Sequence, residues 1–91
     1  MENTFVSGDI VKSVAGRDKG NYFIVVKTER NFAYISDGKI HKVDSLKKKN
    51  VKHLELVYRE GAKSLSDRIV KGEFVGNGRI KKFVSKILKE E

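Results

Sequence analysis

Apolar and polar residues alternate along the first part of the chain with the period of β-strands. The alternation predicts five short strands, over residues 9–14, 21–28, 32–36, 39–43 and 54–58. In the second of them the apolar positions from Tyr22 to Val26 fall on both sides of the strand, so both of its faces can be covered. Five short strands without an intervening helical pattern predict a small barrel or sandwich.

Two glycine-containing turns connect these strands. Residues 16–20, with the sequence Gly-Arg-Asp-Lys-Gly, join the first two strands, and the closing glycine can adopt a positive φ. Asp37 and Gly38 predict a type I′ hairpin turn, which would return residues 39–43 beside residues 32–36. Residues 44–52 are polar and lack periodicity, which predicts a loop.

The spacing of apolar residues becomes helical after residue 61. A capping-box-like start at residues 64–67 and the i,i+4 pair of Leu65 and Ile69 predict a short helix, with Gly72 just past its end. Asn77 is a suitable N-cap for a second helix. The apolar face of this second helix consists of Ile80, Phe83, Val84, Ile87 and Leu88. We expect that face to pack on the strands.

Positive charge is concentrated in one part of the chain. The 91 residues carry a formal net charge of +8, yet residues 1–38 are neutral, with five Lys or Arg against five Asp or Glu. Residues 39–53 hold six lysines against Asp44 alone, a net charge of +5. A basic segment beside a neutral one favours a directed anion-binding surface, and nucleic acid is one class of partner for it.

Catalytic, metal and membrane functions have little support in the sequence. Cysteine is absent, and His41 and His53 are the only histidines, so neither a thiolate nor a nucleophilic triad nor a metal-ligand spacing is present. We therefore expect no enzymatic activity and no cofactor. The apolar run from Tyr22 to Val26 is too short to cross a bilayer, and the first residues lack the pattern of a signal peptide. A cytoplasmic protein without a membrane partner is expected.

The stretch from residue 8 to the second strand resembles the KOW motif of ribosomal and transcription-associated proteins. The residues that carry the resemblance are Gly8, Asp9, Val11, Ser13, the turn of residues 16–20 and the apolar run that follows. A second stretch is similar to the basic segment of bacterial KOW proteins and of large-subunit ribosomal proteins of the same type, at residues 37–40, 42–43 and 47–54. The chain departs from those relatives at His41, where they often have arginine, and at Ser45 and Leu46, where they often have proline.

The resemblance implies an SH3-like barrel that binds structured RNA, either ribosomal or translation-associated. Together with the strand and helix patterns it predicts a mainly β fold, with a small SH3-like five-stranded barrel over residues 1–61 and two short C-terminal helices over residues 62–91. We expect the helical extension to pack on the barrel as part of a single domain. The expected partners are RNA, the ribosome and ribosomal proteins, and the free chain is expected to be a monomer.

Charged residues form the larger part of the candidate RNA-binding site. In the first turn Arg17 offers a planar fork for phosphate and Lys19 a point charge, while Gly20 allows close approach of the backbone. Asp18 could pair with either of these cations. The basic segment could follow a phosphate backbone. Its candidate contacts are Lys39, His41, Lys42, Lys47, Lys48, Lys49, Lys52 and His53, and Lys12 on the first strand is added to them.

Phe32 and Tyr34 are the aromatic candidates. If Ala33 and Ile35 face the core, the two aromatic side chains face outward beside lysines, where they could stack unpaired bases. A register shift of one residue would place them in the core instead.

Simpler and alternative interpretations stay open. The glycine turn could be a charged hairpin loop without a ligand, and the lysine segment could be a solvated loop. A transcription-elongation-associated KOW module would bind polymerase or nascent RNA, and an SH3-like protein-interaction module would bind no RNA. The basic second helix could contact a membrane or a partner, although its apolar face is expected to be covered by the barrel.

Overall fold

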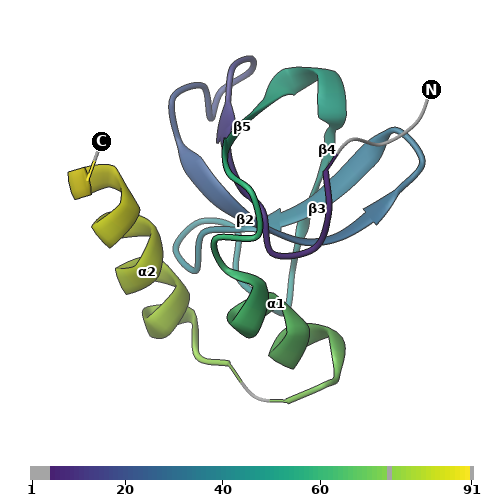
Figure 1. Cartoon of the computed structure of the whole chain (residues 1–91). Coiled ribbons are helices and arrows are strands. Elements are labelled where there is room, and N and C mark those ends of the chain that lie inside the picture. The colour runs from purple at the N-terminus through teal and green to yellow at the C-terminus, as the bar shows by residue number, and fades with distance from the viewer. Residues whose placement is uncertain (1–4, 74, 91) are drawn as a thin grey trace.

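The computed structural model describes residues 5–73 and 75–90 (Figure 1). Within them an antiparallel sheet of five strands is followed by two helices, which confirms the predicted mainly β architecture. The strands are β1 (Ile10–Ser13), β2 (Tyr22–Glu29), β3 (Phe32–Ser36), β4 (Lys47–Asn50) and β5 (Leu54–Tyr58), in the spatial order β4-β3-β2-β1-β5. A short 3₁₀ turn, η1 (Val51–His53), joins β4 to β5, and the helices are α1 (Lys63–Val70) and α2 (Asn77–Glu90).

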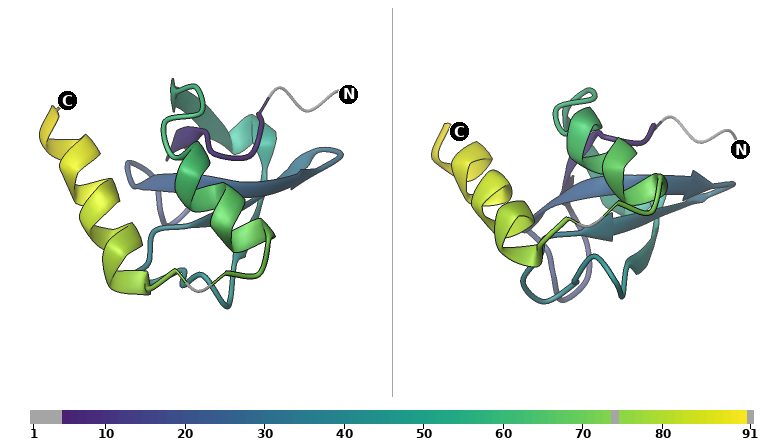
Figure 2. Two further views of the ribbon diagram at one scale, coloured as in Figure 1. Left: turned by 60° about the horizontal axis from the view of Figure 1, so that its bottom comes forward. Right: turned by 90° about the horizontal axis from the view of Figure 1, so that it is seen from below.

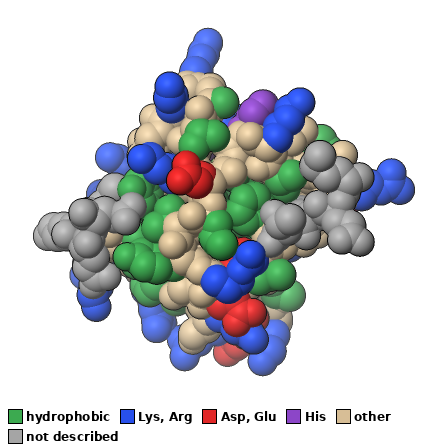
Figure 3. Space-filling view, turned by 45° about the horizontal axis from the view of Figure 1, so that its top comes forward, with side chains coloured by type: hydrophobic (Ala, Val, Ile, Leu, Met, Phe, Trp, Pro, Cys, Tyr) green, Lys and Arg blue, Asp and Glu red, His purple; other side chains and the backbone are tan. Residues whose placement is uncertain are grey.

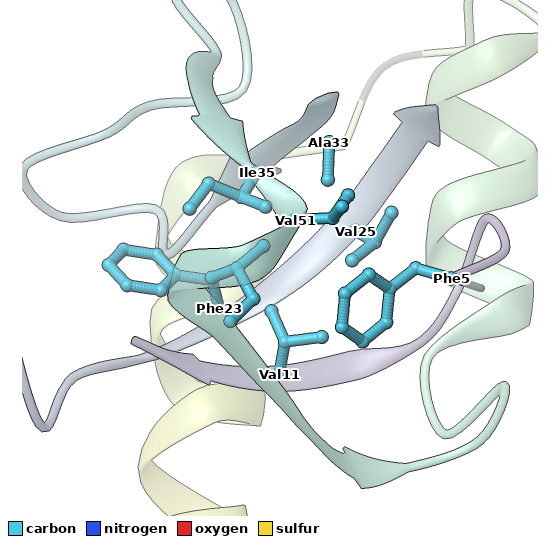
Figure 4. Packing of buried hydrophobic residues seen from close by; sticks show 8 residues of the cluster. Phe5, Val11, Phe23, Val25, Ala33, Ile35 and Val51 are labelled. Atoms are coloured by element: carbon cyan, nitrogen blue, oxygen red, sulfur yellow. The ribbon is translucent and has the colours of Figure 1, made fainter. Parts of the chain in front are cut away.

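The inner face of the sheet holds the first of two apolar clusters. Figure 4 shows side chains from β1, β2 and β3 gathered in one cluster, with the ring of Phe5 from the N-terminal segment beside Val11 and Val25. Phe23 and Ile35 are fully buried there, as the alternation of their strands predicts. The cluster consists of Phe5, Val11, Phe23, Val25, Ala33, Ile35, Val51 and Leu54.

The second cluster lies on the other face of β1 and β2, where α1 lies across β2 and α2 stands beside the start of that strand (Figure 2). Ile10 and Ile24 from the strands meet Leu65 of α1 and Ile80 and Val84 of α2. The prediction that both faces of β2 can be covered is therefore confirmed. The predicted packing of the apolar face of α2 is confirmed as far as residue 87, and the side chain of Leu88 lies outside the part of the chain that the structure describes. Within the described residues, neither helix combines the length and the apolarity that a bilayer span requires.

The connection from β3 to β4 differs from the prediction. The Oδ1 atom of Asp37 accepts hydrogen bonds from the backbone N–H groups of Lys39, Ile40 and His41, at 2.9, 3.1 and 3.0 Å. The predicted strand over residues 39–43 is wrong, because these N–H groups are used within the loop and β3 pairs with β4 instead, with Tyr34 opposite Lys48. The prediction of a loop over residues 44–52 is likewise wrong, since this segment contains β4 and η1.

Helix α2 holds this loop in place. Gly38 has a φ of +71°, and a Cβ atom at this position would meet the carbonyl oxygen of Asn77 and lie 2.8 Å from the backbone nitrogen of Lys81. Helix α2 begins at Asn77, so its N-cap position is Gly76 and the predicted N-cap at Asn77 is wrong by one residue. The side-chain oxygen of Asn77 accepts a hydrogen bond of 2.7 Å from the N–H of Val43 in the loop. The glycine that indicated a hairpin therefore allows the loop and the first turn of α2 to pack backbone against backbone.

Helix α1 begins differently from the prediction. Its N-cap is Ala62, and no side chain caps it, so the capping-box prediction at residues 64–67 is wrong. The N–H of Ala62 donates instead to the carbonyl oxygen of Gly8, which ties the start of α1 to the segment before β1. Gly72 follows the helix with a φ of +82°, as expected of a terminator.

Candidate nucleic-acid interface

The glycine turn between β1 and β2 is closed by a backbone hydrogen bond and exposes two cations. Gly16 and Gly20 have φ values of +89° and +90°, which confirms the positive φ predicted for the closing glycine. The N–H of Gly20 donates to the carbonyl oxygen of Ser13 at 2.8 Å, and this bond closes the turn. Arg17 and Lys19 are exposed at its tip. The turn can therefore present a guanidinium and an ammonium from a defined backbone.

The third charged residue of the turn points inward. Asp18 pairs with Lys49 of β4, whose Nζ atom lies 2.6 Å from Oδ1 of the carboxylate and donates to the carbonyl oxygen of Ala15 at 2.9 Å. The hydroxyl of Ser13 donates to the same carboxylate oxygen at 2.7 Å. Lys49 is only 8% exposed. Asp18 thus pairs with Lys49, and not with Arg17 or Lys19, the two cations considered from the sequence. Lys49, a predicted RNA contact, is buried.

The environment of the Asp18 carboxyl keeps it ionised. Burial raises its pKa, but hydrogen bonds from Lys49 and Ser13 and the charge of Lys49 outweigh this effect and lower the pKa below the ordinary value of 3.8. At neutral pH the pair is therefore a charged cross-link between the glycine turn and β4. It fixes where the exposed cations of the turn stand.

A groove of about 380 Å³ opens between the glycine turn, the loop after β3 and the start of β4, and we call it the turn groove. Arg17 and Lys47 are the exposed cations on its lining. Lys47 lies on the same side of β4 as Lys49, since it is two residues away in a strand, but it stands at the exposed end. The lining residues are Gly16, Arg17, Asp18, Asn21, Asp37, Ile40, His41, Lys47 and Lys49.

A second groove, of about 200 Å³, adjoins the first and lies against α2, and we call it the helix groove. Asn21, Asp37 and Ile40 line both grooves, so the two form one continuous depression. The helix groove also receives Lys39 from the loop and Lys81 from α2. Its full lining is Gly20, Asn21, Tyr22, Asp37, Lys39, Ile40, Lys81, Val84 and Ser85.

Lys81 and Ser85 were not predicted from the sequence as site residues. A signal was present, because residues 77–87 contain four cations and no acid, whereas α1 carries Asp67. The four cations are Arg79, Lys81, Lys82 and Lys86. An acid-free cationic face on an otherwise amphipathic helix could have been added to the candidate site. Figure 3 shows that Lys and Arg side chains project around the rim of one face of the molecule, with apolar side chains nearer its centre.

The other predicted charged residues divide between structural and peripheral positions. His41 is half-buried, with its ring centroid 5.8 Å from that of Phe23. Its carbonyl oxygen accepts from the hydroxyl of Ser36 at 2.8 Å, so this residue helps to close the loop. Lys42 is exposed on the same loop. The remaining candidates lie on β1 and η1 and are not part of the lining of these two grooves: Lys12, Lys52 and His53.

Phe32 and Tyr34 face outward as predicted, because Ala33 and Ile35 are fully buried. Each ring has a lysine above it: the Nζ atom of Lys48 lies 4.4 Å from the centroid of Phe32, and that of Lys27 lies 4.7 Å from the centroid of Tyr34. We call these four side chains the aromatic face. The hydroxyl of Tyr34 also donates to a carboxylate oxygen of Glu29 at 3.1 Å, and this hydrogen bond raises the pKa of Tyr34.

Comparison of the chain with protein-family models and with curated proteins gives no match. The resemblance to the KOW motif therefore rests on the residues named above. Among the described residues, no three His, Asp or Glu side chains come together where they could hold a metal ion. The chemistry that the two grooves offer is that of ammonium, guanidinium, amide and hydroxyl donors, which suits an anionic ligand with several oxygen acceptors.

Proposed function

We propose that this chain is a non-enzymatic RNA-binding protein of the translation machinery, which docks on structured, ribosomal RNA in the cytoplasm. The observation that carries the proposal is the convergence of cations from four separate segments on two adjoining grooves. Arg17 comes from the glycine turn, Lys39 from the loop after β3, Lys47 from β4 and Lys81 from α2. A phosphate backbone, which presents many anionic oxygens in a row, can use such a surface.

The grooves divide the work of binding between positioning and selection. Arg17 can hold one phosphate with two parallel hydrogen bonds, which fixes orientation as well as adding affinity. The lysines contribute point charges whose contacts carry no sequence information. Selectivity would come from the shape of the RNA that fits the continuous depression, because double-helical RNA is recognised by shape and backbone more than by base edges.

The test is the salt dependence of RNA binding. Six exposed cations in or beside the grooves are available for phosphate: Arg17, Lys19, Lys39, Lys42, Lys47 and Lys81. If each displaces counterions from one phosphate, the logarithm of the association constant should fall against the logarithm of salt concentration with a slope of at least about −4, taking the smaller, single-strand coefficient of about 0.7 per phosphate. The probe is a fluorescent stem-loop of ribosomal RNA, titrated at several salt concentrations. A slope near zero would overturn the proposal.

Matched variants locate the contact. Arg17→Gln with Lys19→Gln should make the slope shallower by about 1.4, while thermal stability changes little because exposed charges contribute little to folding. Arg68→Gln with Lys71→Gln removes the same two residue types from the exposed surface at α1 and should leave the slope unchanged. Equal effects of the two double variants would mean that binding follows net charge and uses no defined surface.

A protein partner is the alternative that one observation favours. Ile40 lies where the two grooves meet and is 69% exposed, which would suit an apolar contact with a protein such as a polymerase. If the partner is a protein, Ile40→Ser should weaken binding to that partner more than Arg17→Gln does. Capture of ribosomal particles from cells would support the proposal, whereas capture dominated by RNA polymerase would favour the transcription-elongation role.

A further inference from the structure

The aromatic face lies on the opposite side of β4 from the turn groove. Phe32 and Tyr34 are two residues apart in β3, which places their attachment points about 6.6 Å apart on one side of the sheet. Tyr34 stands directly opposite Lys27 of β2 and Lys48 of β4. Tyr34 is therefore flanked on both sides by cations, whereas Phe32 has Lys48 of the neighbouring strand above its ring.

The two rings are not part of the core. Neither Phe32 nor Tyr34 belongs to an apolar cluster of the described residues, although both are large enough to anchor one. Both lie on a sheet face that is half-exposed, and the side chains above them are the exposed lysines Lys27 and Lys48. An ammonium over a ring at an exposed site is a weak contact, and a nucleic-acid base stacks on such a ring more strongly.

We infer that the aromatic face binds unpaired bases of single-stranded RNA, one on each ring, while Lys27 and Lys48 move from the rings to the adjacent phosphates. The inference rests on the proposed function in that the ligand is RNA, and it adds a second contact surface with a different chemistry. A base that stacks on a ring displaces the lysine ammonium from it, and the ammonium exchanges its cation–π contact for a contact with phosphate. Stacking of bases on aromatic residues of an exposed sheet is a known mode of RNA recognition.

The spacing of the rings favours an unstacked strand. Consecutive bases in a double helix rise by about 3.4 Å, half the separation of the two ring positions, so neighbouring paired bases could not each lie on a ring. A single strand with splayed bases can do so. The carboxylate of Glu29, held by the hydroxyl of Tyr34, fixes that ring and repels phosphate, which directs the backbone of the strand towards the two lysines.

The experiment compares a short oligouridylate, which stacks weakly on itself, with a blunt RNA hairpin. Tyr34→Leu should weaken oligouridylate binding at least about fivefold and leave hairpin binding unchanged. The matched control is Tyr58→Leu, since Tyr58 is a 40% exposed tyrosine on β5 of the same sheet, and it should change neither affinity. Phe32→Leu provides a second variant, and circular dichroism verifies that each protein is folded.

Tyrosine fluorescence gives an independent readout, because the chain has three tyrosines and no tryptophan. Oligouridylate should quench the emission of the wild type and of Tyr58→Leu, but not that of Tyr34→Leu. Lys48→Met should make the salt slope for oligouridylate shallower by about 0.7, the share of one phosphate contact.

The outcomes separate this inference from the proposed function. If the folded Tyr34→Leu and Phe32→Leu variants bind oligouridylate as the wild type does, the inference is overturned while groove-dependent binding of the hairpin stands. If Tyr58→Leu loses as much affinity as Tyr34→Leu, the aromatic face is not the site. If the wild type binds neither RNA, both the inference and the proposed function fail.

Discussion

Lys48 and Lys49 are neighbours in β4 with opposite environments. Lys49 is buried, with its ammonium on the carboxylate of Asp18, whereas Lys48 is exposed, with its ammonium over the ring of Phe32. The difference follows from the period of a strand, because successive side chains point to opposite faces of the sheet. The three consecutive lysines of β4 therefore have three different roles. Lys49 forms a structural ion pair, Lys48 lies on the aromatic face and Lys47 lines the turn groove.

The largest effect should come from breaking the cross-link on the inner side. Lys49→Met leaves the Asp18 carboxylate without its cation in a site where both side chains are almost covered. We expect it to lower the free energy of unfolding by about 2 to 4 kcal/mol, since removing one partner of a buried pair leaves an uncompensated charge. Urea denaturation monitored by circular dichroism measures this loss.

Lys48→Met is the matched control, with the same substitution one residue away. It removes only an exposed cation–π contact and should change the free energy of unfolding by no more than about 1 kcal/mol. Equal losses in the two variants would show that the inner and outer lysines of β4 contribute alike, and the contrast between them would be lost.

A smaller effect should appear in the acid limb of the stability curve. The folded protein holds the pKa of Asp18 below 3.8, so this group adds stability at higher pH, and the contribution is lost as pH falls below 3.8 towards the folded pKa. One proton accounts for at most about 1.4 kcal/mol per pH unit. Lys49→Met removes the main cause of the shift and should flatten this limb.

Unfolding measured between neutral and strongly acidic pH distinguishes the two lysines again. Lys48→Met should retain the acid limb of the wild type, because Lys48 does not contact Asp18. An unchanged limb in Lys49→Met would mean that other carboxylates govern acid unfolding.

The sequence predicted the elements whose signals are local. Strands β1, β2, β3 and β5 follow from alternation, and the outward direction of Phe32 and Tyr34 follows from the apolar residues between and after them. Strand β4 has no apolar alternation, and its inner face depends on a partner for Lys49 that lies 31 positions away. The wrong prediction of a hairpin turn at Gly38 has a similar cause. This glycine is required by the close approach of Asn77, which is far from it in the sequence.

The candidate site was predicted in the same uneven way. The exposure of Arg17 and Lys19 was predicted, because the glycine turn that presents them is a local structure. The place of Lys81 beside Lys39 could not be predicted, because it depends on how α2 docks against the loop after β3. The lysines over the aromatic rings depend on strand register, and that register includes a bulge in β2 between Val25 and Lys27 that alternation does not reveal.

The smallest effect separates the two lysines that share the inner side of β4. Lys47 has the orientation of Lys49 but stands exposed in the turn groove, so Lys47→Gln should change the free energy of unfolding by less than about 0.5 kcal/mol. It should instead make the salt slope of stem-loop RNA binding shallower by about 0.7, the share of one phosphate. Denaturation and salt titration of the same protein measure both quantities. A stability loss as large as that of Lys49→Met would show that the inner side of β4 is structural along its whole length. An unchanged salt slope would show that Lys47 does not contact RNA in the turn groove.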